Sequence, residues 1–373
     1  MRPSIIGRLV LAVVFLPGAT APAQQSAPPL VANQLARDIY KELVEINTTD
    51  SVGSTTKAAE AMAERLKAAG FPAADIQVLG PDPRKGNLVA RFRGTGARKP
   101  LLLLAHTDVV EARREDWSFD PFTFLERDGF FYGRGTSDDK AMAASFVANL
   151  IRLKQEGYRP DRDLILALTA DEEGGSFNGV DWLLKNHRGL IDAEMALNEG
   201  GDGQIRNGKY LTNQIGASEK VYQSFLLEGG HADNALPQTA RATVNCRILP
   251  GEAPAGVKET LTTVLADPKI SVSFLDEAKP SPPSPLPPEV MGALESITRA
   301  MWPGVVVVPT MGTGATDGLY LRNAGIPSYG VDGLFGEVDD VRAHGKDERV
   351  GVKQYYESIE FHYRLVKALS SRN

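Results

Sequence analysis

Side chains able to bind metal ions follow several apolar segments of this 373-residue sequence. The run L-L-L-L-A-H-T-D ends in His106 and Asp108, and G-R-G-T-S-D-D-K contains Asp138. Further along, D-E-E-G-G follows L-I-L-A-L-T-A, and N-E-G-G follows M-A-L. A late polar loop, R-A-H-G-K-D-E, adds a second imidazole. The candidate ligands are His106, Asp138, Glu173, Glu199 and His344.

Two imidazoles and three carboxylates without a thiolate form a ligand set that suits Zn²⁺, and Co²⁺ or Mn²⁺ would also fit. A carboxylate that bridges allows two metal ions about 3.5–4 Å apart. A single acidic turn is usually only solvated surface. Because several acidic turns and a histidine all follow apolar segments, a metal site is the better explanation.

The apolar segments themselves predict the elements that position these ligands. Four leucines from Leu101 indicate a strand buried on both faces of a sheet. Such strands alternate with amphipathic segments, which indicates an α/β fold with a mainly parallel sheet. Ligands bind at the carboxyl ends of the strands in such sheets. We expect helices at 32–45, 55–69, 139–156 and 180–186, and strands at 75–79, 87–93, 164–169 and 195–197.

From residue 216 to 279 the pattern changes to a small α+β insertion, with strands at 221–228, 242–249 and 270–275 and a helix at 255–266. A stiff proline-rich connector follows at 280–288. The catalytic domain is therefore expected in two parts, 30–215 and 280–373. The second part should contain helices 289–301 and 353–369, strands 305–308 and 328–331, a glycine-rich turn at 311–317 and a helix from there to residue 323.

The N-terminus is expected to be a signal peptide, residues 1–23, with two arginines, an apolar run and an A-P-A cleavage site. Its removal moves the formal charge from −6 to −8, because it contains two arginines and no acidic residue. We expect a periplasmic or secreted protein that does not associate with the membrane after cleavage. The acidic charge without a basic cluster argues against nucleic-acid binding. Cys246 is the only cysteine, so no intramolecular disulfide forms.

Four motifs together resemble the M20 family of metallohydrolases, which includes glutamate carboxypeptidase, aminoacylase and succinyl-diaminopimelate desuccinylase. They are A-H-T-D-V-V, G-R-G-T-S-D-D-K, T-A-D-E-E-G-G and A-L-N-E-G-G, in the order and spacing of the family. The similarity runs from about residue 38 to the C-terminus.

The resemblance implies a role for each matching residue. His106 and Glu199 would hold one metal ion, and Glu173 and His344 the other. Asp138 would bridge the two ions, and Asp108 would orient the imidazole of His106. Glu172 would be the general base that deprotonates a metal-activated water and then protonates the leaving amine. Asp139 occupies a variable position beside the bridge and receives no role.

The insertion is shorter than the lid domains of the family, which usually exceed a hundred residues and carry a G-G-H-S-S-x-P motif. We assign Gly229-Gly230-His231 to a variable position instead, because A-D-N-A-L-P follows it. Asn234 and Arg247 then resemble a later lid motif that binds the substrate carboxylate, and Gly314 to Thr316 would offer backbone N–H groups. The loss of one helix and one strand makes the family-type homodimer doubtful.

The expected function is therefore that of an exported, dinuclear zinc-dependent hydrolase of the carboxypeptidase or dipeptidase type. It would cleave an amide bond next to a carboxylate-bearing residue of a small peptide. The alternatives are an N-acyl-amino-acid deacylase, and a lid-deleted relative that binds metal but is catalytically impaired.

Overall fold

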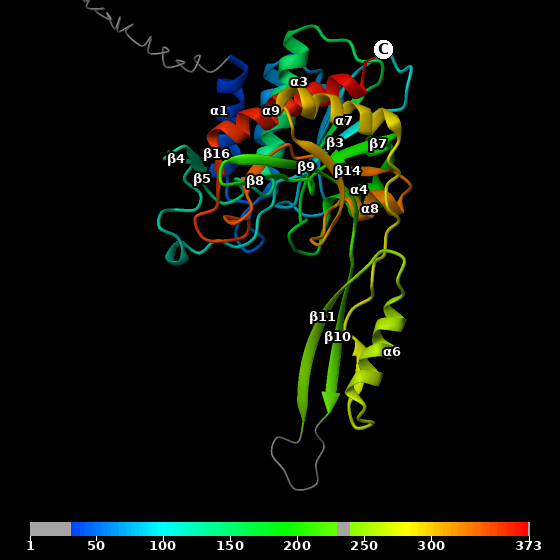
Figure 1. Ribbon diagram of the computed structural model, residues 1–373. Coiled ribbons are helices and arrows are strands. Elements are labelled where there is room, and N and C mark those ends of the chain that lie inside the picture. Colours follow the sequence, from blue (N-terminus) through cyan, green and yellow to red (C-terminus); the bar gives the residue numbers. More distant parts are fainter. Residues whose placement is uncertain (1–30, 230–238, 372–373) are drawn as a thin grey trace, which may run out of the picture.

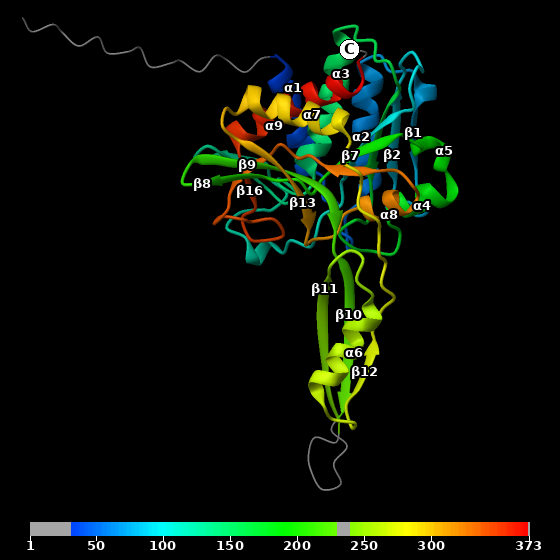
Figure 2. The same ribbon diagram turned by 45° about the vertical axis from the view of Figure 1, so that its right-hand side comes forward.

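The computed structural model describes residues 31–229 and 239–371. It has a large body, with helices packed over a central sheet, and an arm that projects from it (Figures 1 and 2). None of the helices in these two ranges has the length and apolar composition needed to span a bilayer. The mixed α/β fold agrees with the prediction from the sequence.

The central sheet has the strand order β1-β2-β6-β3-β7-β14-β9-β8-β15, with β13 paired to β9. Its middle strands, β6, β3, β7 and β14, run parallel to one another, while β2 and β9 join them in antiparallel fashion. The strands are β1 (Ile76–Leu79), β2 (Asn87–Phe92), β3 (Leu101–His106), β6 (Leu164–Thr169), β7 (Met195–Asn198), β8 (Gly203–Arg206), β9 (Lys209–Glu219), β13 (Val306–Gly312), β14 (Ser328–Gly330) and β15 (Phe335–Glu337).

The leucine-rich strand β3 lies between β6 and β7 and is buried along its whole length. Its side chains alternate between two cores: Leu101 and Leu103 face one, and Leu102 and Leu104 face the other. This is why the sequence is continuously apolar there, since both faces of a parallel sheet are covered by helices.

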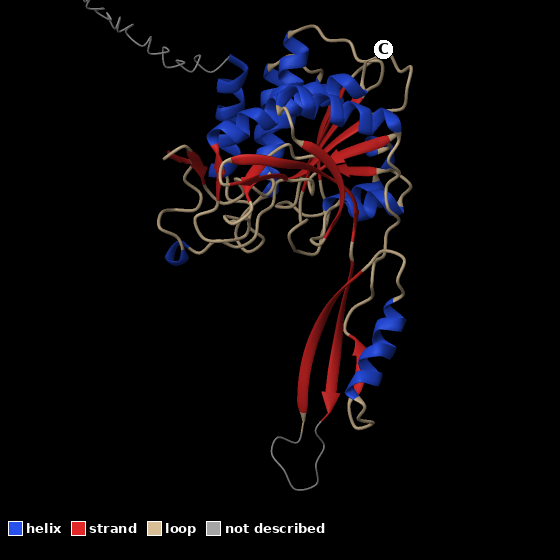
Figure 3. Ribbon diagram, viewed as in Figure 1, coloured by secondary structure: helices blue, strands red, loops and turns tan. Residues whose placement is uncertain are grey.

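Helices cover the two faces of the sheet unequally (Figure 3). One face packs against α1 (Val31–Glu45), α2 (Thr55–Ala68), α3 (Lys140–Gln155), α7 (Pro288–Met301) and α9 (Val352–Leu369). The other packs against α4 (Gly179–Asn186), α5 (Arg188–Ile191) and α8 (Gly318–Asn323). These bounds confirm the expected helices to within one or two residues.

The arm is formed by a separate three-stranded sheet and one helix. The sheet has the order β11-β10-β12, and its strands are β10 (Val221–Gly229), β11 (Ala240–Ile248) and β12 (Ser271–Phe274). Helix α6 (Pro254–Leu265) lies beside β12. The expected three strands and one helix of the insertion are therefore present.

Some elements were not expected from the sequence. Strands β8 and β9 extend the central sheet, and β9 continues to Glu219, past the expected boundary at 216. Strand β13 includes Met311 and Gly312, which we had placed in a turn. A second small sheet, of order β16-β5-β4, joins β4 (Leu125–Arg127), β5 (Phe130–Tyr132) and β16 (Arg349–Gly351). Two short 3₁₀ helices, Ala73–Asp75 and Arg114–Asp116, complete the body.

Candidate metal centre

The candidate ligands gather where the parallel strands end. His106 is the last residue of β3, Glu173 follows β6, and Glu199 follows β7 directly. Asp138 lies just before α3, and His344 comes from the loop between β15 and β16. Parallel strands present their carboxyl ends at one edge of the sheet, so short loops from different segments bring these side chains together.

Asp138 lies between the two imidazoles. Its Oδ1 is 2.9 Å from Nε2 of His106, and its Oδ2 is 2.9 Å from Nε2 of His344. Each oxygen of one carboxylate thus faces a different histidine. This is the geometry in which a carboxylate can bridge two ions, each of which has one imidazole ligand.

The ring of His106 is oriented with Nε2 toward the cluster, as a metal site requires. Its Nδ1 is 3.1 Å from the backbone oxygen of Asp108, which can only accept, so Nδ1 carries the proton. Nε2 faces the carboxylates of Asp138, at 2.9 Å, and Glu199, whose Oε2 is 3.6 Å away, and it would become a metal ligand on loss of its proton. The backbone oxygen of Asp108 lies closer to the ring than its carboxylate, whose Oδ1 is 3.6 Å from Nδ1.

The carboxylate of Asp108 instead supports the neighbouring turn. Its Oδ2 accepts a hydrogen bond from the backbone N–H of Glu173 at 2.9 Å. The side chain of Glu173 then reaches His344, with 2.9 Å between Oε1 and Nε2. Asp108 therefore links β3 to the turn after β6.

Asp139, to which we gave no role, lies in the same cluster. It forms one group of possible ligands with His106 and Glu199, while His106, Asp138 and Glu173 form another. Asp139 is 3% exposed, and its Oδ2 has no hydrogen-bond partner among the described residues. The D-D pair was the signal for it, but two adjacent carboxylates in a sequence do not reveal which of them faces the cluster.

The cluster holds more negative charge than its histidines neutralise. Burial, with a further contribution from the charge of Glu199, raises the pKa of Glu172 to about 10. Burial likewise raises the pKa of Glu199 to about 7 and that of Asp139 well above its ordinary value. Hydrogen bonds to Asp138 and Glu173 raise the pKa of His344 to about 10. Burial lowers the pKa of His106, but Glu199 and the two aspartates outweigh it and raise the pKa well above normal.

Carboxylates that cannot all ionise, and histidines that are driven to protonate, indicate a site built for additional positive charge. Divalent cations supply that charge, and the nitrogen and oxygen donors present are those that zinc prefers. Oδ2 of Asp139, which has no hydrogen-bond partner among the described residues, and Nε2 of His106, which faces Asp138, are the atoms placed to become ligands. The residues therefore fit a metal centre.

A buried ion pair holds two ligand loops together. Nη1 of Arg134 is 2.6 Å from Oε2 of Glu348, and their side chains are 3% and 1% exposed. Arg134 also donates to the backbone oxygen of His344 at 3.2 Å. Glu348 accepts from the backbone and hydroxyl of Ser137 at 2.7 and 2.9 Å, and from Gly135 N at 3.2 Å. The pair thus joins the loop of Asp138 to that of His344.

A cavity of about 850 Å³ opens beside the cluster. Asp138 and Glu199 line it, as do Gly314 and Thr316, the expected substrate-binding residues of the glycine-rich turn. Arg247, at the base of the arm, donates from Nη1 to the backbone oxygen of Thr313 in this turn. Asn234 and His231 lie outside the described residues.

Other charged residues around this turn were missed by the sequence reasoning. Glu219, at the end of β9, pairs with Arg322 at 2.8 Å and accepts from Thr316 Oγ1 at 3.0 Å. Lys220 donates from Nζ to the backbone oxygen of Gly314. Asp317 accepts from Thr169 and Asn178 at 3.1 and 2.6 Å. These contacts hold the glycine-rich turn against the sheet. The sequence does not predict them, because a single charged residue in a polar segment looks the same whether it is solvated or paired.

A buried cluster of histidines and carboxylates at the strand ends of an α/β sheet, beside an open cavity, defines a metal-dependent hydrolase. The comparison with known families gives the more specific assignment. Residues 102–368 match the Peptidase family M20/M25/M40, and the chain belongs to this family of metallopeptidases and amidohydrolases. The resemblance noted in the sequence is thereby confirmed.

Individual relatives are more distant. The N-fatty-acyl-amino acid synthase/hydrolase of Homo sapiens is 25% identical over 372 residues, which cover 72% of this chain and 74% of that protein. The M20 family metallo-carboxypeptidase of Sulfolobus solfataricus has a similar structure, with a TM-score of 0.70, 15% identity, and coverage of 90% of this chain and 99% of that one. A dinuclear metal-binding M20 peptidase of Bacillus subtilis gives a TM-score of 0.62 at 14% identity, covering 91% and 98%.

Proposed function

We propose that this protein is an exported dinuclear zinc hydrolase that cleaves an amide bond next to a carboxylate-bearing residue. The observation that carries the proposal is the position of Asp138, whose two oxygens each lie 2.9 Å from a different histidine. His106 and Glu199 would hold one ion, and Glu173 and His344 the other. Asp139 is a further candidate beside the first ion.

When bound, the two metal ions would polarise the amide carbonyl and lower the pKa of the attacking water. The protein residues handle the proton. Glu172 is the general base: its carboxylate takes the proton from the water and passes it to the nitrogen of the leaving amine. Glu172 follows β6, next to Glu173, and burial and the charge of Glu199 raise its pKa. Two divalent cations at the neighbouring ligands would oppose this rise and favour the carboxylate form that accepts the proton.

Substrate recognition is assigned to the glycine-rich turn and the base of the arm. Gly314 and Thr316 line the cavity next to the metal ligands, and their backbone N–H groups would donate to the substrate. Arg247 contacts the same turn through the backbone oxygen of Thr313, and its guanidinium would hold a carboxylate of the substrate. Asn234 would assist from the part of the arm outside the described residues.

The substrate is a small peptide or an N-acyl amino acid. The first choice is a peptide, as for a carboxypeptidase or dipeptidase, and the M20 metallo-carboxypeptidase shares the fold. The alternative of an N-acyl-amino-acid deacylase is favoured by the similarity to the N-fatty-acyl-amino acid synthase/hydrolase. A metal-binding relative with impaired catalysis is the third candidate, because the described arm has one helix and three strands.

Export to the periplasm or beyond follows from the expected signal peptide at 1–23, and the mature chain is not expected to form the family-type homodimer because its arm is short. Light scattering on the mature protein tests the second point. A stable dimer whose activity is lost in His231→Ala would contradict both the expected absence of this dimer and the assignment of His231 to a variable position.

The activity test uses the purified mature chain loaded with Zn²⁺. Metal analysis should find two ions per chain, with Co²⁺ and Mn²⁺ compared in parallel. A panel of dipeptides, N-acetyl and N-palmitoyl amino acids then distinguishes peptidase from deacylase. Protein that binds two ions and cleaves none of these amides would support the impaired relative and reject the proposed hydrolase.

A further inference from the structure

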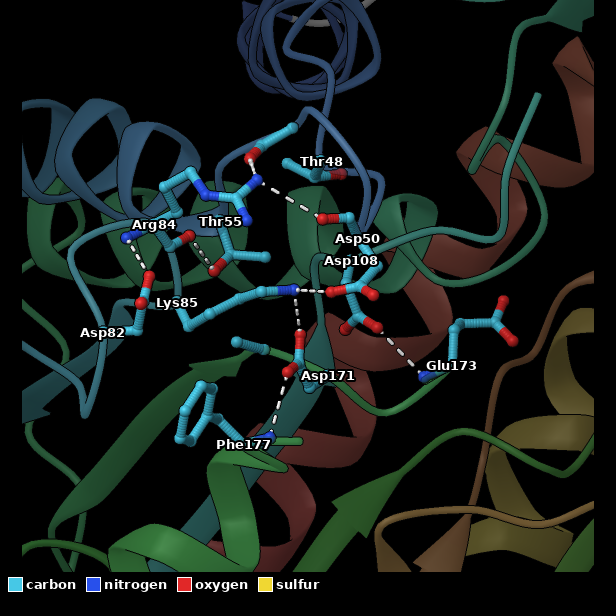
Figure 4. A network of polar contacts seen from close by, with 12 residues as sticks. Thr48, Asp50, Thr55, Asp82, Arg84, Lys85, Asp108, Asp171, Glu173 and Phe177 are labelled. Carbon is cyan, nitrogen blue, oxygen red and sulfur yellow. Dashed lines mark hydrogen bonds and ion pairs between the residues drawn. The ribbon is translucent and has the colours of Figure 1, made fainter. Parts of the chain in front are cut away.

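Next to the metal centre, a buried lysine joins two carboxylates (Figure 4). Nζ of Lys85 lies 2.5 Å from Oδ1 of Asp50 and 2.5 Å from Oδ1 of Asp171. The side chains of Lys85 and Asp171 are 6% and 0% exposed, whereas that of Asp50 is 60% exposed. Asp171 is therefore the partner inside the protein, and Lys85 is the cation that compensates its charge.

The position of Lys85 is set by the start of α2. Thr56 Oγ1 donates to the backbone oxygen of Pro83 and accepts from the N–H of Gly86, both at 2.8 Å. Thr55 Oγ1 donates to the backbone oxygen of Arg84 at 3.1 Å. The backbone before and after Lys85 is thus bound to the first turn of α2. The ammonium group therefore stays in place and does not move with Asp171.

Asp171 is the residue from which the turn with the general base and a metal ligand begins. It has a left-handed backbone, with φ of 57°, and its Oδ2 accepts from the N–H of Phe177 at 3.1 Å. A Cβ at Gly175 would lie only 2.2 Å from the same oxygen. The turn therefore wraps closely around the carboxylate of Asp171, so displacement of this carboxylate displaces the turn.

The turn has two fixed points, and Glu172 lies between them. Lys85 holds Asp171 on one side, and Asp108 accepts from the backbone N–H of Glu173 on the other. Figure 4 shows both contacts, with Asp108 next to the turn. Asp108 also reaches the ring of His106 through its backbone oxygen.

We propose that Lys85 is a positioning residue for the hydrolytic reaction: it places Glu172 and Glu173 through its ion pair with Asp171. The inference rests on the proposed function. Without Lys85, a carboxylate with no exposed surface loses its cation, and the turn must move to hydrate it. A shift of about 1 Å in a catalytic group commonly costs about 10²-fold in rate.

The test compares zinc-loaded wild type with Lys85→Met, using the best amide substrate of the panel and Zn²⁺ affinity measured by chelator competition. Lys85 does not contact the cavity beside the metal ligands, so we expect kcat to fall about 10²-fold while KM changes less than about threefold. Binding of one of the two Zn²⁺ ions should weaken by about tenfold, because Glu173 moves whereas Glu199, which would hold the other ion, does not.

Arg84→Met is the matched control, since Arg84 is in the same loop and carries the same charge. Its Nη1 contacts the backbone oxygens of Asp50, Ser51 and Gly53 but not Asp171. We expect its kcat to stay within about twofold of wild type, as for most surface substitutions. An equal loss of kcat in both variants would show a general effect of the loop and would overturn the inference.

A double variant separates positioning from stability. Lys85→Met with Asp171→Asn removes the unpaired buried charge, so the melting temperature should rise above that of Lys85→Met while kcat stays low. Recovery of kcat together with stability would make Lys85 merely structural. If Lys85→Met does not fold, the kcat of Asp171→Asn alone tests the inference. A fall in kcat of about tenfold supports it, and an unchanged kcat overturns it.

A wild-type protein that cleaves none of the amides would instead reject the proposed function.

Discussion

Removal of Arg134 should destabilise the protein more than removal of any exposed arginine. Its guanidinium is 2.6 Å from Glu348, and the two side chains are 3% and 1% exposed. Breaking such a buried pair costs about 3–5 kcal/mol. Glu348 keeps three other donors, two on Ser137 and one on Gly135, so the lower end, about 3 kcal/mol, applies.

Because the entropy of unfolding is about 2 cal/mol/K per residue, about 3 kcal/mol corresponds in a chain of this size to a fall in melting temperature of roughly 4 °C. Urea unfolding and calorimetry of Arg134→Met measure both quantities. Arg364→Met is the control: Arg364 makes a 2.7 Å pair with Glu360 but is 43% exposed, so its loss should cost less than about 1 kcal/mol. Arg134→Met combined with Glu348→Gln removes the buried charge and should recover part of the stability.

A loss below about 1 kcal/mol in Arg134→Met would refute this reasoning, because it would mean that Glu348 needs no cation. A double variant that is less stable than Arg134→Met alone would refute it as well. We also expect Zn²⁺ binding to weaken by about 10–100-fold in Arg134→Met, since the pair joins the loops of Asp138 and His344.

Three further predictions concern the general base, the metal ions and a buried histidine. Glu172→Gln should lower kcat by about 10²–10⁴ and retain its zinc; loss of zinc would instead make Glu172 a ligand. Chelation should lower the melting temperature reversibly, because each site with free metal ion at about 1,000 times its Kd contributes about 4 kcal/mol to the stability. His362 donates from Nε2 to Val331 O at 2.7 Å and accepts from Ser145 at 2.8 Å, and burial lowers its pKa to about 4. The unfolded chain binds this proton first, so up to about 3 kcal/mol present above pH 6.5 should be lost as the pH falls toward 4, and His362→Gln should flatten that slope in urea titrations.

The sequence predicted those strands and helices whose buried residues are apolar. The run from Leu101 is apolar because β3 is covered on both faces, and the polar residues after it mark the strand end. The same rule located β6 and β7. Because each of these strands ends in a histidine or is followed by a carboxylate, the edge that carries the site could be predicted together with the sheet.

The missed elements are those whose burial depends on distant partners. Strand β9 contains Thr212, Asn213 and Gln214, which resemble a loop, yet Asn213 is fully buried and donates to Thr298 at 2.9 Å. The small sheet pairs Tyr132 with Arg349, far apart in sequence, through strands of three residues. Such short strands have no detectable periodicity of their own.

In the site, the sequence identified residues that follow strands but not those that hold them in place. Lys85 and Glu348 stand in charged segments that look solvent-exposed, R-K-G and K-D-E-R. Their burial arises only when loops from remote segments meet. A charged residue in a polar motif gives the same local pattern whether it is solvated or paired inside the protein, so these two could not be distinguished from surface residues.

The attachment of the arm has a consequence for how the length of this insertion can vary. The chain leaves the body after Glu219 and returns near Ser284, whose N–H donates to the backbone oxygen of Ala217 at 2.7 Å. The two points at which the chain leaves and re-enters the body are therefore adjacent, and both are attached to β9. The entropy of closing a loop between two such points rises by only about 0.6 kcal/mol for each doubling of its length. Insertions and deletions beyond this junction consequently leave the sheet and its ligands almost unaffected, which makes residues 221–279 a place where natural or engineered modules of very different size can be exchanged.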